Sequence, residues 1–422
     1  MEFIGVIAVF VGMLVVANFK KIFSNDIDYD LNSAEVKLLK KTCKVLNLTT
    51  SRDGTESYGT IDQHRFLLKI ESESIFSLFV YHELPVEGQV TIRRENLSSK
   101  IKRNIGKGDI LIGDSSFDDV MLLRSENAVE VTALLNSKNR IMITELSEDT
   151  GSFSVSSEGI KANFDVIKFH PNMISRFVKD MIAASKSLCQ KSDIRNMLIK
   201  NTLSDPEPGV RINNLRMLAL HYSLEQDLVY AVLESLKDFS MDMQVEAASL
   251  LQEEGMEHLV GILKRNEKTS DTILLKIIEL IHENCYSKGA EVLKEIYNIK
   301  GQEIRIAVLK AFETFGETAL APFLAERLNV QDNALLVSLF RALGTCGTVN
   351  EIERIGGLAK IIGHANVRKE ARKAIALIQD RYGVDKGWLS VAEYTETDGA
   401  LSMANEDAEG GLSFTKEKNN QK

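Results

Sequence analysis

The chain has 422 residues, of which 51 are Lys or Arg and 60 are Asp or Glu, so its formal net charge is −9. With 44% hydrophobic and 26% charged residues, the composition excludes a largely disordered chain, and the length is enough for two or three domains. A protein that binds nucleic acid usually carries a basic face. The basic cluster at 93–107 is short and is interpreted as a solvated loop, so no nucleic-acid partner is predicted.

The N-terminal segment 3–19 contains no charged residue and is followed by Lys20 and Lys21. At roughly 1.5 Å per residue, a helix over this segment matches the hydrocarbon core of a bilayer, about 30 Å thick. Residues 1–23 are therefore predicted to form one transmembrane anchor in the inner (cytoplasmic) membrane. Because the lysines follow the span, the positive-inside rule places the bulk of the chain in the cytoplasm. A cleaved signal peptide is the alternative, but Val15-Val16-Ala17 is a poor cleavage site and no basic residue precedes the apolar run.

Segment 24–170 is predicted to be an α+β domain. Runs that favour strands lie at 64–70, 75–81, 89–93, 120–123, 140–145 and 152–156, and helices are predicted at 33–46 and 127–137. In the motif at 112–119, Gly113 and Asp114 indicate a turn between two strands. A second interpretation makes Asp114, Asp118 and Asp119 a cation site, although their spacing lacks the glycine and glutamate of a calcium loop.

Beyond residue 171 the chain is predicted to be helical and internally repeated. Apolar anchor positions, each followed by a helical stripe, recur at Val210, Val245, Ile273, Ile304, Leu335 and Val367. Partner helices are predicted between them at 193–202, 227–237, 257–265, 291–297, 320–328 and 352–362. Two helices in each unit of about 30 residues are typical of an α-solenoid, whose units bury their apolar faces against one another. An all-α superhelical solenoid is therefore predicted over 171–390.

The fourth unit shows the repeat pattern well, because Ile304-Arg305 is followed by Val308, Phe312 and Phe315-Gly316 at helical spacing. This start, the small residues and the step of about 31 residues between anchors resemble HEAT repeats of the short bacterial type. The resemblance implies a HEAT-like solenoid over nearly half of the chain. The second unit departs from the pattern, since Val245-Glu246 lacks the arginine and Glu253 stands where an apolar residue is expected.

Three arginines share one position of the repeat unit: Arg211, Arg305 and Arg368. They are the candidate partner-binding residues, because a row of guanidinium groups could bind carboxylates of a partner peptide. The structural interpretation is also open, since the resemblance implies that such an arginine bonds an acid or a helix end of a neighbouring repeat.

The sequence contains no recognisable catalytic, metal or cofactor set. The four cysteines are scattered, as in a reducing compartment, and the pairs His82-Glu83 and His282-Glu283 are too few for the metal site of HEAT-like hydroxylases. The predicted function is a membrane-tethered scaffold, not an enzyme, that binds a protein partner through the solenoid. The alternative is a lyase or protein-modifying enzyme of the HEAT-like class.

The C-terminal segment 391–422 is acidic and has few large apolar residues. It is predicted to be a disordered tail. Two Gly-x-Leu-Ser phrases, which begin at Gly399 and Gly410, are either a short docking motif or a coincidence of composition.

Overall fold

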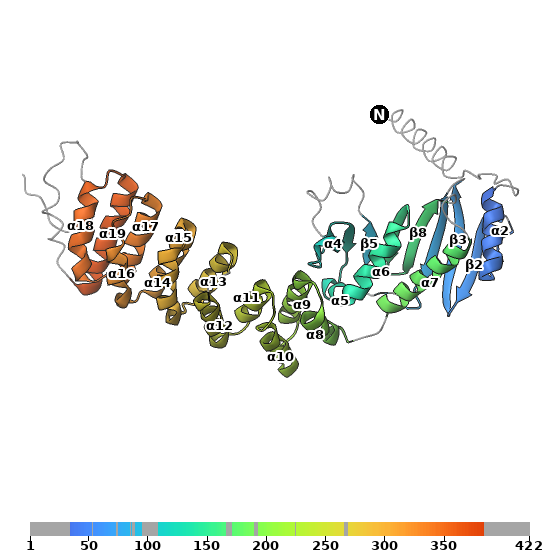
Figure 1. Ribbon diagram of the computed structural model, residues 1–422, viewed down its shortest axis with the longest axis horizontal. Coiled ribbons are helices and arrows are strands. Elements are labelled where there is room, and N and C mark those ends of the chain that lie inside the picture. The colour runs from blue at the N-terminus through green and yellow to red at the C-terminus, as the bar shows by residue number, and fades with distance from the viewer. Residues whose placement is uncertain are drawn as a thin grey trace, which may run out of the picture. The chain divides into compact units, whose positions relative to one another are not determined.

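The computed structural model describes residues 34–52, 54–72, 75–84, 86, 89–94, 109–165, 171–189, 193–223, 225–265 and 269–383. By its internal contacts the chain divides into two units, Met1–Ile277 and Ile278–Lys422. The first unit holds a sheet, its covering helices and the first helical pairs, and the second holds further helical pairs (Figure 1). The predicted anchor at 1–23 and the predicted acidic tail at 391–422 lie outside the described residues.

Among the described residues of the first unit, eight strands form one antiparallel sheet in the order β1-β2-β3-β4-β8-β7-β5-β6. The strands are β1 (Thr49–Thr50), β2 (Glu56–Ile61), β3 (His64–Ser72), β4 (Ile75–Tyr81), β5 (Thr91–Arg94), β6 (Met121–Arg124), β7 (Ser152–Ser156) and β8 (Gly159–Asp165). Alternate side chains of β3, Phe66, Leu68 and Ile70, are buried, as expected where one face of a sheet is covered. The β2–β3 hairpin turns on two residues with positive φ, which suits the twist of the strands.

Helices α2 (Ala34–Leu46), α6 (Ser137–Glu148) and α7 (Pro171–Leu188) share one hydrophobic core with the sheet. The sequence assigned α7 to the solenoid, but its buried residues Ile174 and Val178 belong to this core, and α7 contacts β4, α2 and α6. The first helical pair follows α7 and begins near residue 193, as predicted.

The predicted strand at 140–145 is wrong, because this segment lies inside α6. The side chain of Asn136 caps the helix, and the buried residues Arg140, Ile143 and Leu146 recur at helical spacing. The apolar residues that suggested a strand are not all buried, since the Ile141 side chain is 56% exposed. The other predicted strands and both helices of this region are confirmed to within a few residues, with α5 at Ala128–Leu134, whereas β1, β2 and β8 were not predicted.

The first unit continues with helices that pack in consecutive pairs. They are α8 (Ile194–Ser204), α9 (Pro208–His221), α10 (Gln226–Ser235), α11 (Met241–Ser249) and α12 (Glu253–Lys264), and α13 (Asp271–Glu283) extends past the division between the units. The α8–α9 pair packs on α5. At this junction a Cβ on Gly209 would lie 2.2 Å from the backbone oxygen of Gly113, so the contact requires a glycine there.

The second unit continues the pairing. Its helices are α14 (Ala290–Ile299), α15 (Gln302–Phe315), α16 (Ala321–Glu326), α17 (Asn333–Cys346), α18 (Ile352–Ile361) and α19 (Ala365–Tyr382), with short 3-10 turns before α14, α16 and α18. Within it α17 packs against both α15 and α19.

The predicted helices after residue 193 are all present, and five of the six anchors are buried. At the third anchor the buried residue is Leu274 instead of Ile273, a shift of one position. The second sequence repeat, anchored at Val245, departs from the repeat pattern for a structural reason. Helix α11 ends at Ser249, so Glu253 is the first residue of α12 and not a core position of α11.

Candidate functional site

A buried ion network joins the sheet-bearing part of the first unit to its first helical pair. Arg140 Nε donates to Asp114 Oδ2 at 2.7 Å, and its two Nη atoms donate to Asp205 at 2.9 Å each. Burial alone would raise the pKa of Asp114, but hydrogen bonds from Ser116 and Arg140 and the Arg140 charge hold it below its usual value. Because Arg140 also donates to the Leu135 carbonyl at 2.8 Å, its charge is well compensated, and we interpret the network as structural.

The aspartates Asp114 and Asp118 of the motif at 112–119 accept hydrogen bonds from neighbouring backbone groups. Asp114 caps the short helix α4 (Ser115–Asp118) through its side chain, and Asp118 accepts from the backbone nitrogens of Ile112 at 3.0 Å and Gly113 at 2.8 Å. These contacts favour the turn over the cation site. In the part of the chain that the structure describes, no group of three or more His, Cys, Asp or Glu is placed to hold a metal ion.

A histidine and a serine form a buried polar cluster between the sheet and α7. His82 Nδ1 lies 2.7 Å from Ser185 Oγ, and its Nε2 lies 3.1 Å from the Ser156 carbonyl oxygen. Since a carbonyl only accepts, Nε2 carries the proton and Nδ1 accepts from the serine hydroxyl. A nucleophile activated by a base has this geometry, but Ser185 is 0% exposed, so a substrate cannot reach it in this structure.

The same burial sets the protonation states of this cluster. Desolvation is the main reason that the pKa of His82 falls to about 4, so the imidazole is neutral at pH 7. Burial also raises the pKa of the neighbouring Cys189 thiol to about 11. A protonated thiol is a poor nucleophile, and we therefore assign this cluster a structural role.

Polar side-chain bridges connect neighbouring helical pairs and recur with the period of the sequence repeat. Their sequence separations are 27 to 32 residues. In the first unit they are Arg195–Asp227, Arg211–Asp238, Arg216–Glu246 and Lys276–Glu246, and in the second unit His282–Thr314, Asn298–Arg327, Gln302–Asp332 and Arg341–Glu370. Equivalent positions of successive pairs thus meet in space, which is the behaviour of a repeat.

The candidate partner-binding arginines Arg211 and Arg305 make side-chain contacts within the chain. Arg211 binds Asp238 through two hydrogen bonds of 2.8 Å and donates to the Asp205 carbonyl at 2.7 Å. Arg305 donates to the Tyr297 carbonyl at 2.9 Å and lies over the Tyr297 ring at 5.5 Å. Arg368 lies partly buried in the first turns of α19. The contacts of Arg211 are those expected from the structural interpretation of these residues.

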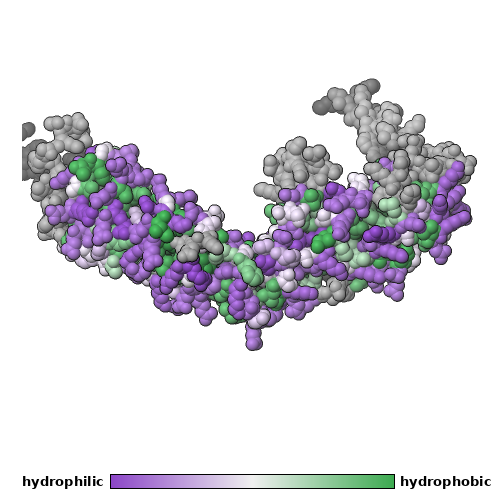
Figure 2. Space-filling view, in the orientation of Figure 1, coloured by the Kyte–Doolittle hydropathy of each residue, from purple (hydrophilic) through white to green (hydrophobic). Residues whose placement is uncertain are grey.

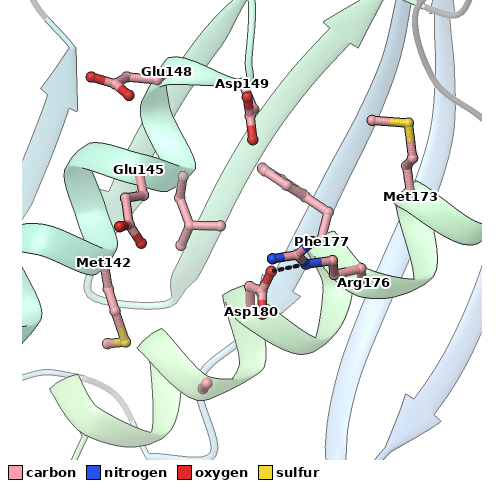
Figure 3. Close-up of a pocket in the computed structure, with 10 residues that line it drawn as sticks. Met142, Glu145, Glu148, Asp149, Met173, Arg176, Phe177 and Asp180 are labelled. Carbon is pink, nitrogen blue, oxygen red and sulfur yellow. Dashed lines mark ion pairs between the residues drawn. The ribbon is translucent and has the colours of Figure 1, made fainter.

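A pocket of about 510 Å³ opens between α6 and α7 (Figure 3). Its apolar lining includes Leu146 and Phe177, which are only 5% and 7% exposed. Met142 and Met173 extend this apolar lining toward opposite ends of the view in Figure 3. The pocket thus has an apolar base supplied by both helices.

The rim of this α6–α7 pocket is acidic. Glu145, Glu148 and Asp149 come from α6 and its C-terminal end, and Asp180 comes from α7. The cation among the lining residues is Arg176, whose Nε lies 3.8 Å from Asp180. Four carboxylates and one guanidinium leave a net charge of −3 around the opening.

Sequence reasoning did not find the α6–α7 pocket. It placed one wall, at 140–145, in a strand and assigned the other, α7, to the solenoid. The available signal was the helical spacing of Met142, Glu145, Leu146 and Asp149, all of which line the pocket. Apolar and acidic residues at steps of three or four positions indicate an amphipathic helix.

Comparisons with known proteins do not classify the chain. No protein family and no curated protein matches it. It is similar to two crystal structures of engineered proteins, at 16% and 17% identity, with coverage of 60% of this chain in both cases and of 69% and 97% of the other chain. Their TM-scores of 0.33 and 0.23 are too low to support a conclusion. Within the described residues, no helix is both long and apolar enough to cross a membrane.

Proposed function

We propose that the chain is a membrane-tethered scaffold whose HEAT-like repeats bind a partner protein. The observation that carries the proposal is the repetition of helical pairs linked by side-chain bridges about 30 residues apart. Stacked pairs of this kind present a long side-chain surface, because each pair contributes the same positions to it. Such a surface suits an extended protein partner.

The surface of the helical pairs has the mixed character of a protein-binding surface. Figure 2 shows hydrophobic patches within a mostly hydrophilic face. In the first unit, Leu220, Tyr230 and Phe239 are 76%, 58% and 107% exposed. Large apolar side chains that remain in water are common at interaction sites, where a partner covers them.

Two of the three repeat arginines remain candidates for partner binding. Arg211 is held by Asp238 and contributes to the packing of neighbouring pairs, so we assign it a positioning role. Arg305 and Arg368 are proposed to bind carboxylates of the partner. Both lie on helices that pack against α17.

Substitution of Arg305 and Arg368 by Ala tests the scaffold directly. The full chain is purified from solubilised membranes, and co-purifying proteins are quantified by mass spectrometry relative to the chain. We expect a stoichiometric partner with the native chain and a loss of affinity of at least about a hundredfold in the double variant, since each charge-assisted hydrogen bond contributes about 1.5–3 kcal/mol. The control is Lys310→Ala with Arg372→Ala, which removes two exposed cations from the same helices. Absence of a stoichiometric partner, or an equal loss in the control, would contradict the proposal.

The anchor at 1–23 and the cytoplasmic placement of the remaining chain complete the proposal. They are supported by the uncharged segment 3–19 and by the lysines that follow it. A reporter that is active only outside the cytoplasm, fused after Lys422, is expected to stay silent. Reversal of Lys20 and Lys21 to Glu should raise its activity, whereas the same reversal at Lys310 and Lys369 should not. Strong activity of the native fusion would overturn this placement.

A further inference from the structure

We propose that the α6–α7 pocket is a second docking site, which binds a basic amphipathic segment of a protein partner. An apolar side chain of the segment occupies the base of the pocket, and its Lys or Arg residues meet the acidic rim. The site lies on the sheet-bearing part of the first unit. It is therefore independent of the helical pairs and of their arginines.

The size and lining of the pocket fit a side-chain anchor. Its volume of about 510 Å³ falls within the range of about 300–1,000 Å³ typical of binding pockets. The base consists of Leu146 and Phe177, and Met173 at its edge is 50% exposed. Methionine side chains adapt to different apolar partners and are frequent in grooves that receive amphipathic helices.

The charge of the rim selects the kind of partner. With a net charge of −3 among the lining residues, the opening attracts cationic segments and repels acidic peptides and anionic lipid surfaces. Charges at the edge of an interface act mainly on the association rate and on specificity. The occupant is therefore a segment that combines basic residues with at least one large apolar residue.

The rim carboxylates are available to such a segment. Glu145, Glu148 and Asp149 are exposed, in contrast to Asp114, which is held in the buried network with Arg140. Asp180 pairs with Arg176 at 3.8 Å, with both side chains more than half exposed. An exposed pair of this kind contributes little stability, so an incoming cation can replace Arg176 at low cost.

Methyl resonances of methionine provide a readout at the site itself. The full chain, labelled at the methionine methyl groups and held in zwitterionic nanodiscs, is titrated with a peptide of about 14 residues that carries Leu and Lys at helical spacing. We expect the Met142 and Met173 signals to shift and saturate, while the signals of Met243, buried in α11, remain unchanged. Two reference peptides, with Glu for Lys or Ser for Leu, should bind at least about tenfold more weakly.

Two double variants distinguish the effect of the rim carboxylates from the effect of the overall negative charge of the chain. Glu145→Gln with Asp149→Asn should weaken the Lys/Leu peptide about tenfold and reduce its salt dependence. Glu279→Gln with Glu295→Gln, which neutralises two exposed acids in α13 and α14, should leave binding unchanged. The proposal is overturned if the Met142 and Met173 signals do not move, if the Glu peptide binds equally well, or if both double variants behave alike. All four substituted positions are exposed, so both double variants are expected to fold. Their methyl spectra without peptide, compared with that of the native chain, check this.

Discussion

His82 and Arg140 show two opposite solutions for an ionisable side chain in the interior of the first unit. His82 is 8% exposed and gives up its charge, because desolvation lowers its pKa to about 4. Arg140 is 2% exposed and stays charged, because the carboxylates of Asp114 and Asp205 surround it. Paired charges can remain ionised when buried, whereas an unpaired base becomes neutral. His82 is therefore the more sensitive of the two to acid in the physiological range.

The stability of the sheet should fall in mild acid because of His82. Its folded pKa of about 4 lies below the ordinary histidine value of 6.5, so between these values the unfolded chain binds a proton that the folded chain does not. By linkage the stabilisation is complete above pH 6.5 and is lost as the pH falls toward 4, with a loss of about 2 kcal/mol by pH 5. Hydrogen-exchange protection of β4 and β8 at pH 7 and pH 5, corrected for intrinsic exchange, measures this loss.

The variant His82→Gln isolates the histidine from the other acid-sensitive groups. A glutamine amide can donate to the Ser156 carbonyl and accept from Ser185 but does not titrate. Relative to the native chain, the variant should lose less protection between the two pH values, by about 2 kcal/mol. Equal losses would show that the imidazole does not control the acid response of the sheet.

At the scale of the elements, the sequence predicts best what depends on local periodicity. The anchor Val210 and the repeat position Phe312 both lie in the core, because a helix repeats its buried face every three or four residues along the chain itself. The prediction for segment 140–145 was wrong because local strand propensity was given too much weight. Its β-branched residues favour a strand, but the Asn136 cap and packing against α7 and the sheet stabilise a helix.

The candidate site illustrates the limit of this local reasoning. Its equivalent position in several repeats drew attention to Arg211, yet whether such a side chain faces solvent depends on Asp238, 27 residues away. The α6–α7 pocket depends on the meeting of two helices, with Glu145 on one and Asp180 on the other. No periodicity in either helix alone reveals that pairing, since it is set by the tertiary fold.

At the scale of the whole molecule, the division into two units raises the question of how far a local change spreads. Phe312 is 0% exposed in an aromatic cluster of the second unit. Its ring lies 5.9 Å from that of Phe323, which in turn lies 5.7 Å from Tyr297. Its carbonyl accepts from the Cys346 thiol at 3.1 Å, so one residue connects α15, α16 and α17. In a repeat array, each pair is stabilised mainly by its direct neighbours.

Replacement of Phe312 by Ala should therefore loosen the second unit without unfolding the sheet. The lost side chain leaves a cavity whose cost is about 3–5 kcal/mol, and hydrogen exchange on the full chain should show that loss in α15, α16 and α17. The control Leu377→Ala, at a side chain that is 51% exposed, should cost less than about 1 kcal/mol. Protection of β3, β4 and β8 should change by no more than about 0.5 kcal/mol, because distant sites are nearly independent. A uniform loss across the sheet and the helices would instead show that both units unfold as one cooperative body.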